Sequence, residues 1–320
     1  MNHAETGMSR LTLGPVLFNW PAETTRDFYF RIADEAPVGI VYLGEVVCSK
    51  RSAFFEPYLP EVVDRLERAG KEVVYSTLAL ITSERDMAEV RAVTARTDVR
   101  VEANDVAGAA MLAGRPHAIG PFVNIYNEST LAYFVGKGAT RVVLPAELPA
   151  RSLAVLAKAA EGTDLEVQVF GRLPLAISAR CHHARSRNLR KVSCQYVCAD
   201  DPDGMDVETL DYEPFLAVNG TQTMSHASVN LVHELDALQE MGIGGFRLWP
   251  HSIDMCAVAR VFRDVLDGRQ ESQAAEARLA ELVDFAPFSN GFYHGREGAA
   301  WVTAPAPSPD VSSGSVLESF

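Results

Sequence analysis

The chain has 320 residues, of which 48% are hydrophobic and 22% charged, and its net charge is −13. This composition is typical of a globular protein with a sizeable core, and it excludes a disordered or collagen-like chain. The acidic excess argues against broad binding to nucleic acid or to a membrane surface, although it leaves room for a local basic site.

The first residues, MNHAETGMSRLTLGPVLF, lack a basic segment followed by a long apolar stretch, so we expect no secretory signal. No apolar run approaches the roughly 18 residues that a membrane-spanning helix needs. We therefore predict a cytoplasmic protein. Five cysteines in that compartment favour metal or redox use over a disulfide framework.

Short apolar segments alternate with helical patterns along most of the chain. The segments predicted as strands are residues 10–18, 37–44, 71–80, 98–104, 117–124, 140–145, 164–171 and 244–250. Helical patterns cover residues 23–35, 56–70, 83–96, 105–114, 128–138, 148–162 and 252–268. Ser83 with Asp86 indicates a capped helix start. Eight strands in strand–helix order predict an α/β fold, a (β/α)8-type, TIM-like barrel, with a doubly wound open sheet as the alternative.

About 70 residues, from 172 to 242, interrupt this alternation between the last two strands. The segment is too long for an ordinary connection, so we predict an insertion that carries function and contains its own hairpin. We expect residues 1–302 to form a single barrel-like domain that includes the insertion. Residues 303–320 are rich in Pro, Ser and Ala and are predicted to be a disordered tail.

The insertion contains three of the five cysteines in CHHARSRNLRKVSCQYVC, residues 181–198. Cys48 follows the second predicted strand, and Cys181 follows the seventh. Because the carboxyl ends of parallel barrel strands share one rim, Cys48 and Cys181 should lie there, and Cys194 and Cys198 could fold over it. Four thiolates can hold zinc or an iron–sulfur cluster, and the irregular spacing favours the cluster. Alternatively, these cysteines are inert core residues.

Five basic residues and no acidic residue surround these cysteines: Arg180, Arg185, Arg187, Arg190 and Lys191. Positive charge stabilises thiolates and would offset the negative charge of a four-thiolate cluster. Cys256 lies on the apolar face of the last predicted helix, where core packing is expected; it is the reserve ligand if Cys48 is not one.

Other polar residues follow strands and could line a substrate mouth, or simply cap helices and loops. They are Asn124, Asn127, Arg247, Trp249, Glu45 and Lys50. His226 and His233 are seven residues apart, a spacing that could place both on one helix face. We expect the adjacent His182 and His183 to be exposed or to support neighbouring groups.

The segments GEVVCSKR, SARCHHARSRNLRKVSCQYVC and GGFRLWP resemble the collagenase-like peptidase family U32, with the resemblance extending over roughly residues 11–295. They resemble in particular the members that act in oxygen-independent ubiquinone biosynthesis. The resemblance implies a [4Fe–4S] cluster held by Cys48, Cys181, Cys194 and Cys198.

The same resemblance implies partners: a heterodimer with a UbiU-like paralogue, assistance from a UbiT-like lipid-binding protein, and a prenylated aromatic quinone precursor that is hydroxylated without dioxygen. Peptidase activity is not expected, because the sequence has neither a His-Glu-x-x-His helix nor a Gly-x-Ser-x-Gly elbow. The alternatives are an RNA-modifying hydroxylation protein of the wider family, which the net charge disfavours, and an interaction subunit that a zinc ion or cluster merely stabilises.

Overall fold

The computed structural model describes residues 9–160 and 162–303. Its eight barrel strands are β1 (Arg10–Leu13), β2 (Ile40–Leu43), β3 (Glu72–Ser76), β4 (Arg100–Ala103), β5 (His117–Ile119), β6 (Ala139–Val143), β7 (Asp164–Ile177) and β11 (Gly245–Leu248). Each is parallel to the next, and β11 pairs with both β7 and β1, which closes the ring. The predicted (β/α)8-type barrel is confirmed, and the open-sheet alternative is wrong.

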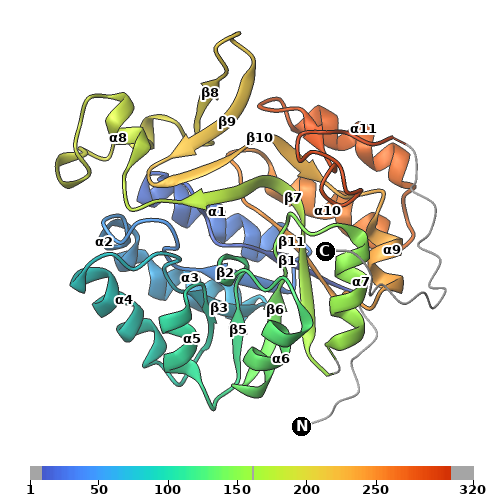
Figure 1. Ribbon diagram of the computed structural model, residues 1–320, viewed down its shortest axis with the longest axis horizontal. Coiled ribbons are helices and arrows are strands. Elements are labelled where there is room, and N and C mark those ends of the chain that lie inside the picture. Colours follow the sequence, from blue (N-terminus) through green and yellow to red (C-terminus); the bar gives the residue numbers. More distant parts are fainter. Residues whose placement is uncertain (1–8, 161, 304–320) are drawn as a thin grey trace, which may run out of the picture.

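Helices follow the barrel strands and cover the outside of the ring (Figure 1). They are α1 (Ala22–Glu35), α3 (Leu59–Arg68), α4 (Glu84–Thr94), α5 (Val106–Leu112), α6 (Glu128–Gly136), α7 (Ala150–Ala159), α9 (Leu235–Glu240) and α10 (Met255–Leu266). The Ser83 side chain accepts a hydrogen bond from the Asp86 amide, as the capping pattern predicts. No helix in the described ranges is long and apolar enough to cross a membrane.

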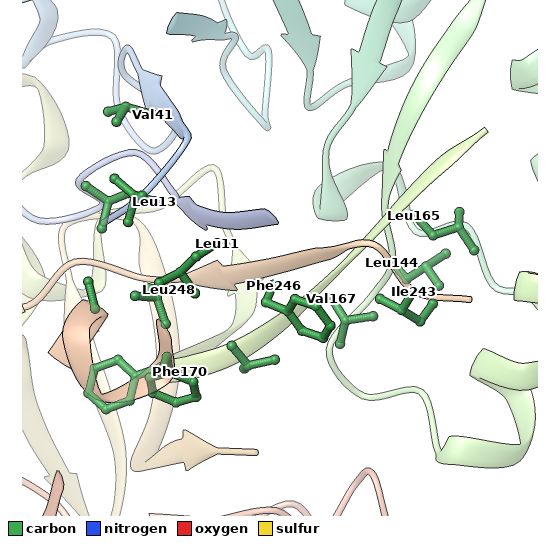
Figure 2. Close-up of a cluster of buried hydrophobic side chains, with 14 of the residues drawn as sticks. Leu11, Leu13, Val41, Leu144, Leu165, Val167, Phe170, Ile243, Phe246 and Leu248 are labelled. Atoms are coloured by element: carbon green, nitrogen blue, oxygen red, sulfur yellow. The ribbon is translucent and has the colours of Figure 1, made fainter. Parts of the chain in front are cut away.

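Alternating residues of the strands build two different layers. Outward-facing residues such as Leu11, Val167, Phe246 and Leu248 form the core between the barrel and its helices, and Figure 2 shows them side by side. This alternation is the period of two that a strand imposes on its side chains. The main hydrophobic core therefore lies outside the ring of strands.

The inside of the barrel contains a buried polar network centred on Arg247. Its guanidinium pairs with Glu102 at 2.8 Å and with Glu166, and it lies 3.8 Å from the centre of the Tyr42 ring. Thr12 and Tyr42 also donate to Glu166, at 2.7 and 3.0 Å. Arg247 is fully buried, so its suggested role in lining a mouth is wrong.

The insertion between β7 and β11 forms a second layer above the carboxyl ends of the strands. Its elements are α8 (His182–Ser186), η3 (Lys191–Ser193), η4 (Val197–Asp200), β8 (Met205–Glu208), β9 (Pro214–Asn219) and β10 (Gln222–Asn230). The strand predicted to end at residue 171 continues to Ile177 and pairs antiparallel with β10. In Figure 1 the β8–β9 hairpin projects from the top of the molecule beside α8.

Five further elements complete the described chain. They are α2 (Ser52–Phe55), η1 (Glu56–Tyr58), η2 (Pro121–Val123), α11 (Ser272–Leu282) and β12 (Phe288–Ser289). The α2 and η1 turns lengthen the connection from β2 to α3. Apart from residue 303, the tail predicted to be disordered lies outside the described residues.

Candidate cysteine site at the barrel rim

Cys48 lies in the loop that follows β2, residues 44–51, which we call the Cys48 loop. The loop begins at Gly44, whose φ of +119° and close approach to the Ser76 carbonyl leave no space for a side chain. The Glu45 carboxylate accepts hydrogen bonds from the Val47 and Cys48 amides, at 2.7 and 2.9 Å. These bonds fix the backbone around Cys48, which is half-buried.

Cys181, Cys194 and Cys198 are all buried in residues 181–198, which we call the cysteine loop. Cys181 caps the short helix α8, and its sulfur accepts from the Ala184 amide at 3.4 Å. Cys181 and Cys194 belong to one small apolar cluster that also contains Ala184. The loop therefore presents two of its thiols together.

Direct hydrogen bonds join the cysteine loop to the first two βα loops of the barrel. The Lys50 ammonium donates to the Cys194 sulfur at 3.3 Å and to the carbonyls of residues 191 and 192, at 2.8 and 3.3 Å. The Asn19 side chain, after β1, donates to the Cys198 sulfur at 3.3 Å. Chain segments more than 140 residues apart thus meet at the sulfur atoms.

The hairpin behind the cysteine loop is anchored in the same place. Asn219 donates to the carbonyls of Cys198 and Asp201, both at 2.8 Å. Thr221 donates to the Val47 carbonyl in the Cys48 loop at 2.9 Å. Through these bonds the β9–β10 hairpin connects the backbone at Cys198 with the Cys48 loop.

Arg51 places a positive charge among the thiols. It is 5% exposed, donates to Asn219 at 3.1 Å, and lies 3.3 Å from the Glu45 carboxylate. Its Nε and Nη2 atoms have no hydrogen-bond partner among the described residues. Because leaving part of a buried guanidinium without hydrogen bonds is costly, this arrangement suits a further anionic group on the side of the cysteines.

Burial and the neighbouring charges shift the pKa values of two of the thiols, Cys198 and Cys48. Burial raises the pKa of Cys198 above its ordinary value; Cys181 and Cys48 raise it further, while Arg51 and Asn19 oppose the rise. Burial also raises the pKa of Cys48, against the influence of Arg51. Cys198 is therefore within electrostatic reach of two other candidate thiols, and Arg51 favours the thiolate form of both Cys48 and Cys198.

The donor chemistry fits a metal group held by thiolates, because soft sulfur ligands suit zinc and iron–sulfur clusters and N–H donors to sulfur stabilise them. The four thiols are not close enough together to form a finished site. Nowhere in the described ranges do three or more His, Cys, Asp or Glu side chains form a group that could hold one metal ion. The ligand role of the four cysteines thus stays a prediction.

Cys256 lies apart from this site. It is 2% exposed in the main core, on α10, and its sulfur contacts the Arg31 carbonyl at 3.6 Å. Burial raises its pKa to about 11. These surroundings are those of a packing residue.

The histidines have structural contacts. His226 lies on β10 and His233 follows that strand, so the shared helix face suggested by their spacing is wrong. His226 contacts Asp206 at 3.1 Å, and His233 contacts Glu276 at 2.7 Å. His182 is exposed, whereas His183 is fully buried beside Asp201.

Among the other polar residues suggested for a substrate mouth, one caps a helix and two line a hollow. Asn127 caps α6 by accepting from the Thr130 amide. Asn124 and Trp249 line a hollow of about 220 Å³ at the mouth of the barrel. A second, open hollow of about 420 Å³ lies beside Cys181 and is lined by Arg180, Arg185, Arg190 and Lys191, so the predicted basic surroundings of that cysteine are present.

Three residues of the cysteine site were not predicted from the sequence: Asn19, Arg51 and Asn219. Arg51 is the last residue of the quoted segment GEVVCSKR, and Asn219 precedes a glycine in a hairpin turn. Both therefore stand beside a local signal, although neither position indicates the distant group that the side chain contacts. Asn19 had none, because only the fold brings it to Cys198.

The chain matches one protein-family model and resembles several solved structures of low sequence identity. The model of Peptidase family U32 matches residues 21–303. A tryptophan synthase complex from Pyrococcus furiosus is 13% identical with a TM-score of 0.40, over 86% of this chain and 97% of that chain. Tryptophan synthase from M. tuberculosis is 10% identical with a TM-score of 0.37, over 86% and 92%. The glycoside hydrolase family 5 enzyme PbGH5A from Prevotella bryantii is 9% identical with a TM-score of 0.39, over 77% and 86%. Such distant structures say nothing about the chemistry of this chain.

Proposed function

Because the chain belongs to peptidase family U32, we propose that it is a UbiV-like iron–sulfur subunit of an oxygen-independent hydroxylase in ubiquinone biosynthesis. In this proposal Cys48, Cys181, Cys194 and Cys198 hold a [4Fe–4S] cluster. The substrate is a prenylated aromatic quinone precursor. The working unit is a heterodimer with a UbiU-like paralogue, served by a UbiT-like lipid-binding protein.

The observation that carries the proposal is the meeting of the cysteine loop with the Cys48 loop. Lys50 and Asn19, which come from two separate βα loops, each donate to a sulfur atom of the cysteine loop. Purely structural cysteines need no such donors, because a buried thiol behaves as a small hydrophobic group. Donors to sulfur are expected where the sulfur carries negative charge as a ligand.

The positive charge around the thiols supports the same proposal. Arg51 is buried beside Cys48 and Cys198, and the basic hollow lies beside Cys181. A four-thiolate cluster would supply the electron-transfer centre that amino-acid side chains do not readily provide. The chain's own residues would bind it, neutralise its charge and shield it with the cysteine loop.

Iron analysis tests the ligand set. Protein purified without oxygen should contain about four iron and four sulfide per chain. Alanine at any of the four proposed ligands should remove most of the iron. The matched control is Cys256→Ala, which should retain iron. Stoichiometric zinc without sulfide in such preparations would contradict the cluster.

Quinone analysis tests the function. Cells that carry Cys194→Ala should fail to make ubiquinone without oxygen and should make it normally with oxygen, where other hydroxylases operate. The variant must first be shown to remain soluble and bound to its partner. Normal anaerobic ubiquinone in that strain would exclude a redox role for the cluster.

A further inference from the structure

A cavity of about 420 Å³ lies beside the rim, apart from both hollows described above. Its walls come from the loops after β1, β2 and β3 and from the helices α1, α2 and α4. Its aromatic side chains are Phe18, Trp20, Tyr29, Phe54, Phe55 and Tyr75. The volume and the apolar walls are typical of a site for a small organic ligand, and we call this cavity the aromatic pocket.

The charges in the wall of the aromatic pocket cancel. Three glutamates and three arginines line it: Glu45, Glu56, Glu89, Arg51, Arg85 and Arg96. Each arginine already has a protein partner. Arg51 pairs with Glu45, Arg85 donates to the Ser49 carbonyl, and Arg96 pairs with Asp98 and lies over the Tyr75 ring. The pocket wall therefore has no excess of positive charge for a phosphate or carboxylate, which favours an uncharged ligand.

Glu89 offers a carboxyl group to a ligand in the pocket. One of its carboxylate oxygens accepts from the Ser52 hydroxyl at 2.6 Å, and the other has no hydrogen-bond partner in the described part of the chain. Burial raises the pKa of Glu89 to about 7, helped by the negative charges of Glu45 and Asp86 and opposed by Ser52 and Arg85. A carboxyl group in this state can both accept a hydrogen bond from a hydroxyl group and donate one to it.

The aromatic pocket shares a wall with the cysteine site. Asn19 lines the pocket and donates to the Cys198 sulfur. Glu45 lines it and accepts from the Cys48 amide. Arg51 lines it as well and bears on the pKa of both cysteines. A ligand in the pocket would therefore be separated from the thiols by a single layer of side chains.

We propose that the aromatic pocket binds an uncharged phenol with an apolar substituent, with the ring between the aromatic walls and the hydroxyl group hydrogen-bonded to Glu89. The ring is inferred from the aromatic walls and the equal numbers of acidic and basic residues, and the hydroxyl group from the Glu89 carboxyl group. The nature of the substituent, an isoprenoid chain, rests on the proposed function.

Binding of two matched probes tests the hydroxyl contact. The probes are 2-geranylphenol and geranylbenzene, which differ only in the hydroxyl group. Quenching of tryptophan fluorescence reports binding, since Trp20 lines the pocket. The full chain, purified without oxygen, should bind the phenol roughly tenfold more tightly, because a hydrogen bond to a carboxyl group contributes about that factor. Equal affinities in the wild-type protein would overturn the contact.

Variants of α4 locate the contact and the site. Glu89→Met should bind both probes with similar, weak affinity, whereas Glu84→Met, on an exposed residue of the same helix, should keep the preference for the phenol. If Glu89→Met keeps the preference for the phenol, a group other than Glu89 forms the hydrogen bond to the hydroxyl group.

Val93→Trp, which fills the pocket, should lower the binding affinity for both probes at least tenfold. Ala88→Trp, on the exposed side of α4, should not. Unchanged binding in Val93→Trp would place the ligand elsewhere. This variant keeps the test valid even if Glu89→Met folds poorly.

These measurements separate the inference from the proposed function. Binding requires no turnover, so normal anaerobic ubiquinone in the Cys194→Ala strain would refute the redox role while the pocket assignment stood. Absence of probe binding together with loss of anaerobic ubiquinone would refute the pocket and leave the redox role standing.

Discussion

Lys50 joins the Cys48 loop to the cysteine loop by hydrogen bonds to both backbone and sulfur atoms. Its three hydrogen bonds go to two carbonyl oxygens and to Cys194, and it lies 5.3 Å from the centre of the Tyr196 ring. We predict that Lys50→Met releases iron to a chelator on the order of ten times faster than the wild-type protein, because a charge-assisted hydrogen bond to the ligand is lost.

The matched control for this prediction is Lys71→Met. Lys71 also donates to two loop carbonyls, those of Ala36 and Val38, but in the loop that leads into β2, at the opposite end of that strand from Cys48. Its replacement should leave the rate of iron release unchanged. Equal rates in the two variants would mean that the bond to Cys194 does not protect the proposed cluster.

Residues with a local signal were predictable, and residues that act across the fold were not. Ser83 and Asn127 cap the helices that follow them, as their positions in the sequence indicate. Asn19 contacts a cysteine 179 residues away, and Arg51 contacts an asparagine 168 residues away. A hydrogen bond over such a separation leaves no periodic pattern in one sequence, so only the packed barrel reveals it.

Arg247, on β11, is expected to contribute strongly to the stability of the fold through its ion pairs inside the barrel. Replacing it with Met should cost about 3–5 kcal/mol of unfolding free energy, because the buried carboxylates of Glu102 and Glu166 would both lose the guanidinium that pairs with them. Chemical denaturation measures the loss. The control is Arg68→Met, which removes an exposed pair with Asp64 and should cost about 0–1 kcal/mol.

The pH dependence of the same variant gives a second check. Burial acts to raise the pKa of Glu166, but Arg247 and Arg141 outweigh it and hold the pKa below the ordinary value. Without Arg247 the pKa of Glu166 in the folded state should lie above its unfolded value, so the folded state binds more protons. The variant should then gain stability as the pH falls from neutral toward the ordinary carboxyl pKa. A variant that instead loses stability over that range would contradict this account of the network.

At the level of elements, all eight barrel strands could be predicted because each is a short apolar run between turn residues. The end of β7 could not. Gly171, with a φ of +104°, and Pro174 look like strand breakers, yet the strand passes both because β10 supplies an antiparallel partner with irregular register. Arg172 is held there by the carbonyls of Ser225 and His226. That partner comes from the insertion itself, which local patterns do not pair with β7.

For the whole molecule, the distribution of exposed hydrophobic side chains bears on the proposed heterodimer. Of the eleven large hydrophobic residues most exposed in the described ranges, five lie between residues 175 and 215. Leu210, Tyr212 and Phe215 are 99%, 81% and 60% exposed around the tip of the β8–β9 hairpin. The strand β8 is also an edge of the sheet, with no neighbour on its outer side among the described strands. Apolar side chains on a free edge are typical of a surface that a partner covers.

We predict that Leu210→Asp combined with Phe215→Asp separates the chain from the proposed UbiU-like partner. Exposed apolar anchors dominate interface energies, and burying two new carboxylates would lower the affinity at least a hundredfold. Co-expression followed by size exclusion measures the complex. The control pair, Val106→Asp with Tyr133→Asp, changes side chains that are 63% and 59% exposed on α5 and α6, and it should leave the complex intact. A complex that survives the hairpin substitutions but not the control pair would move the interface to the helices around the barrel. Two separate monomers from the wild-type pair would refute the heterodimer itself.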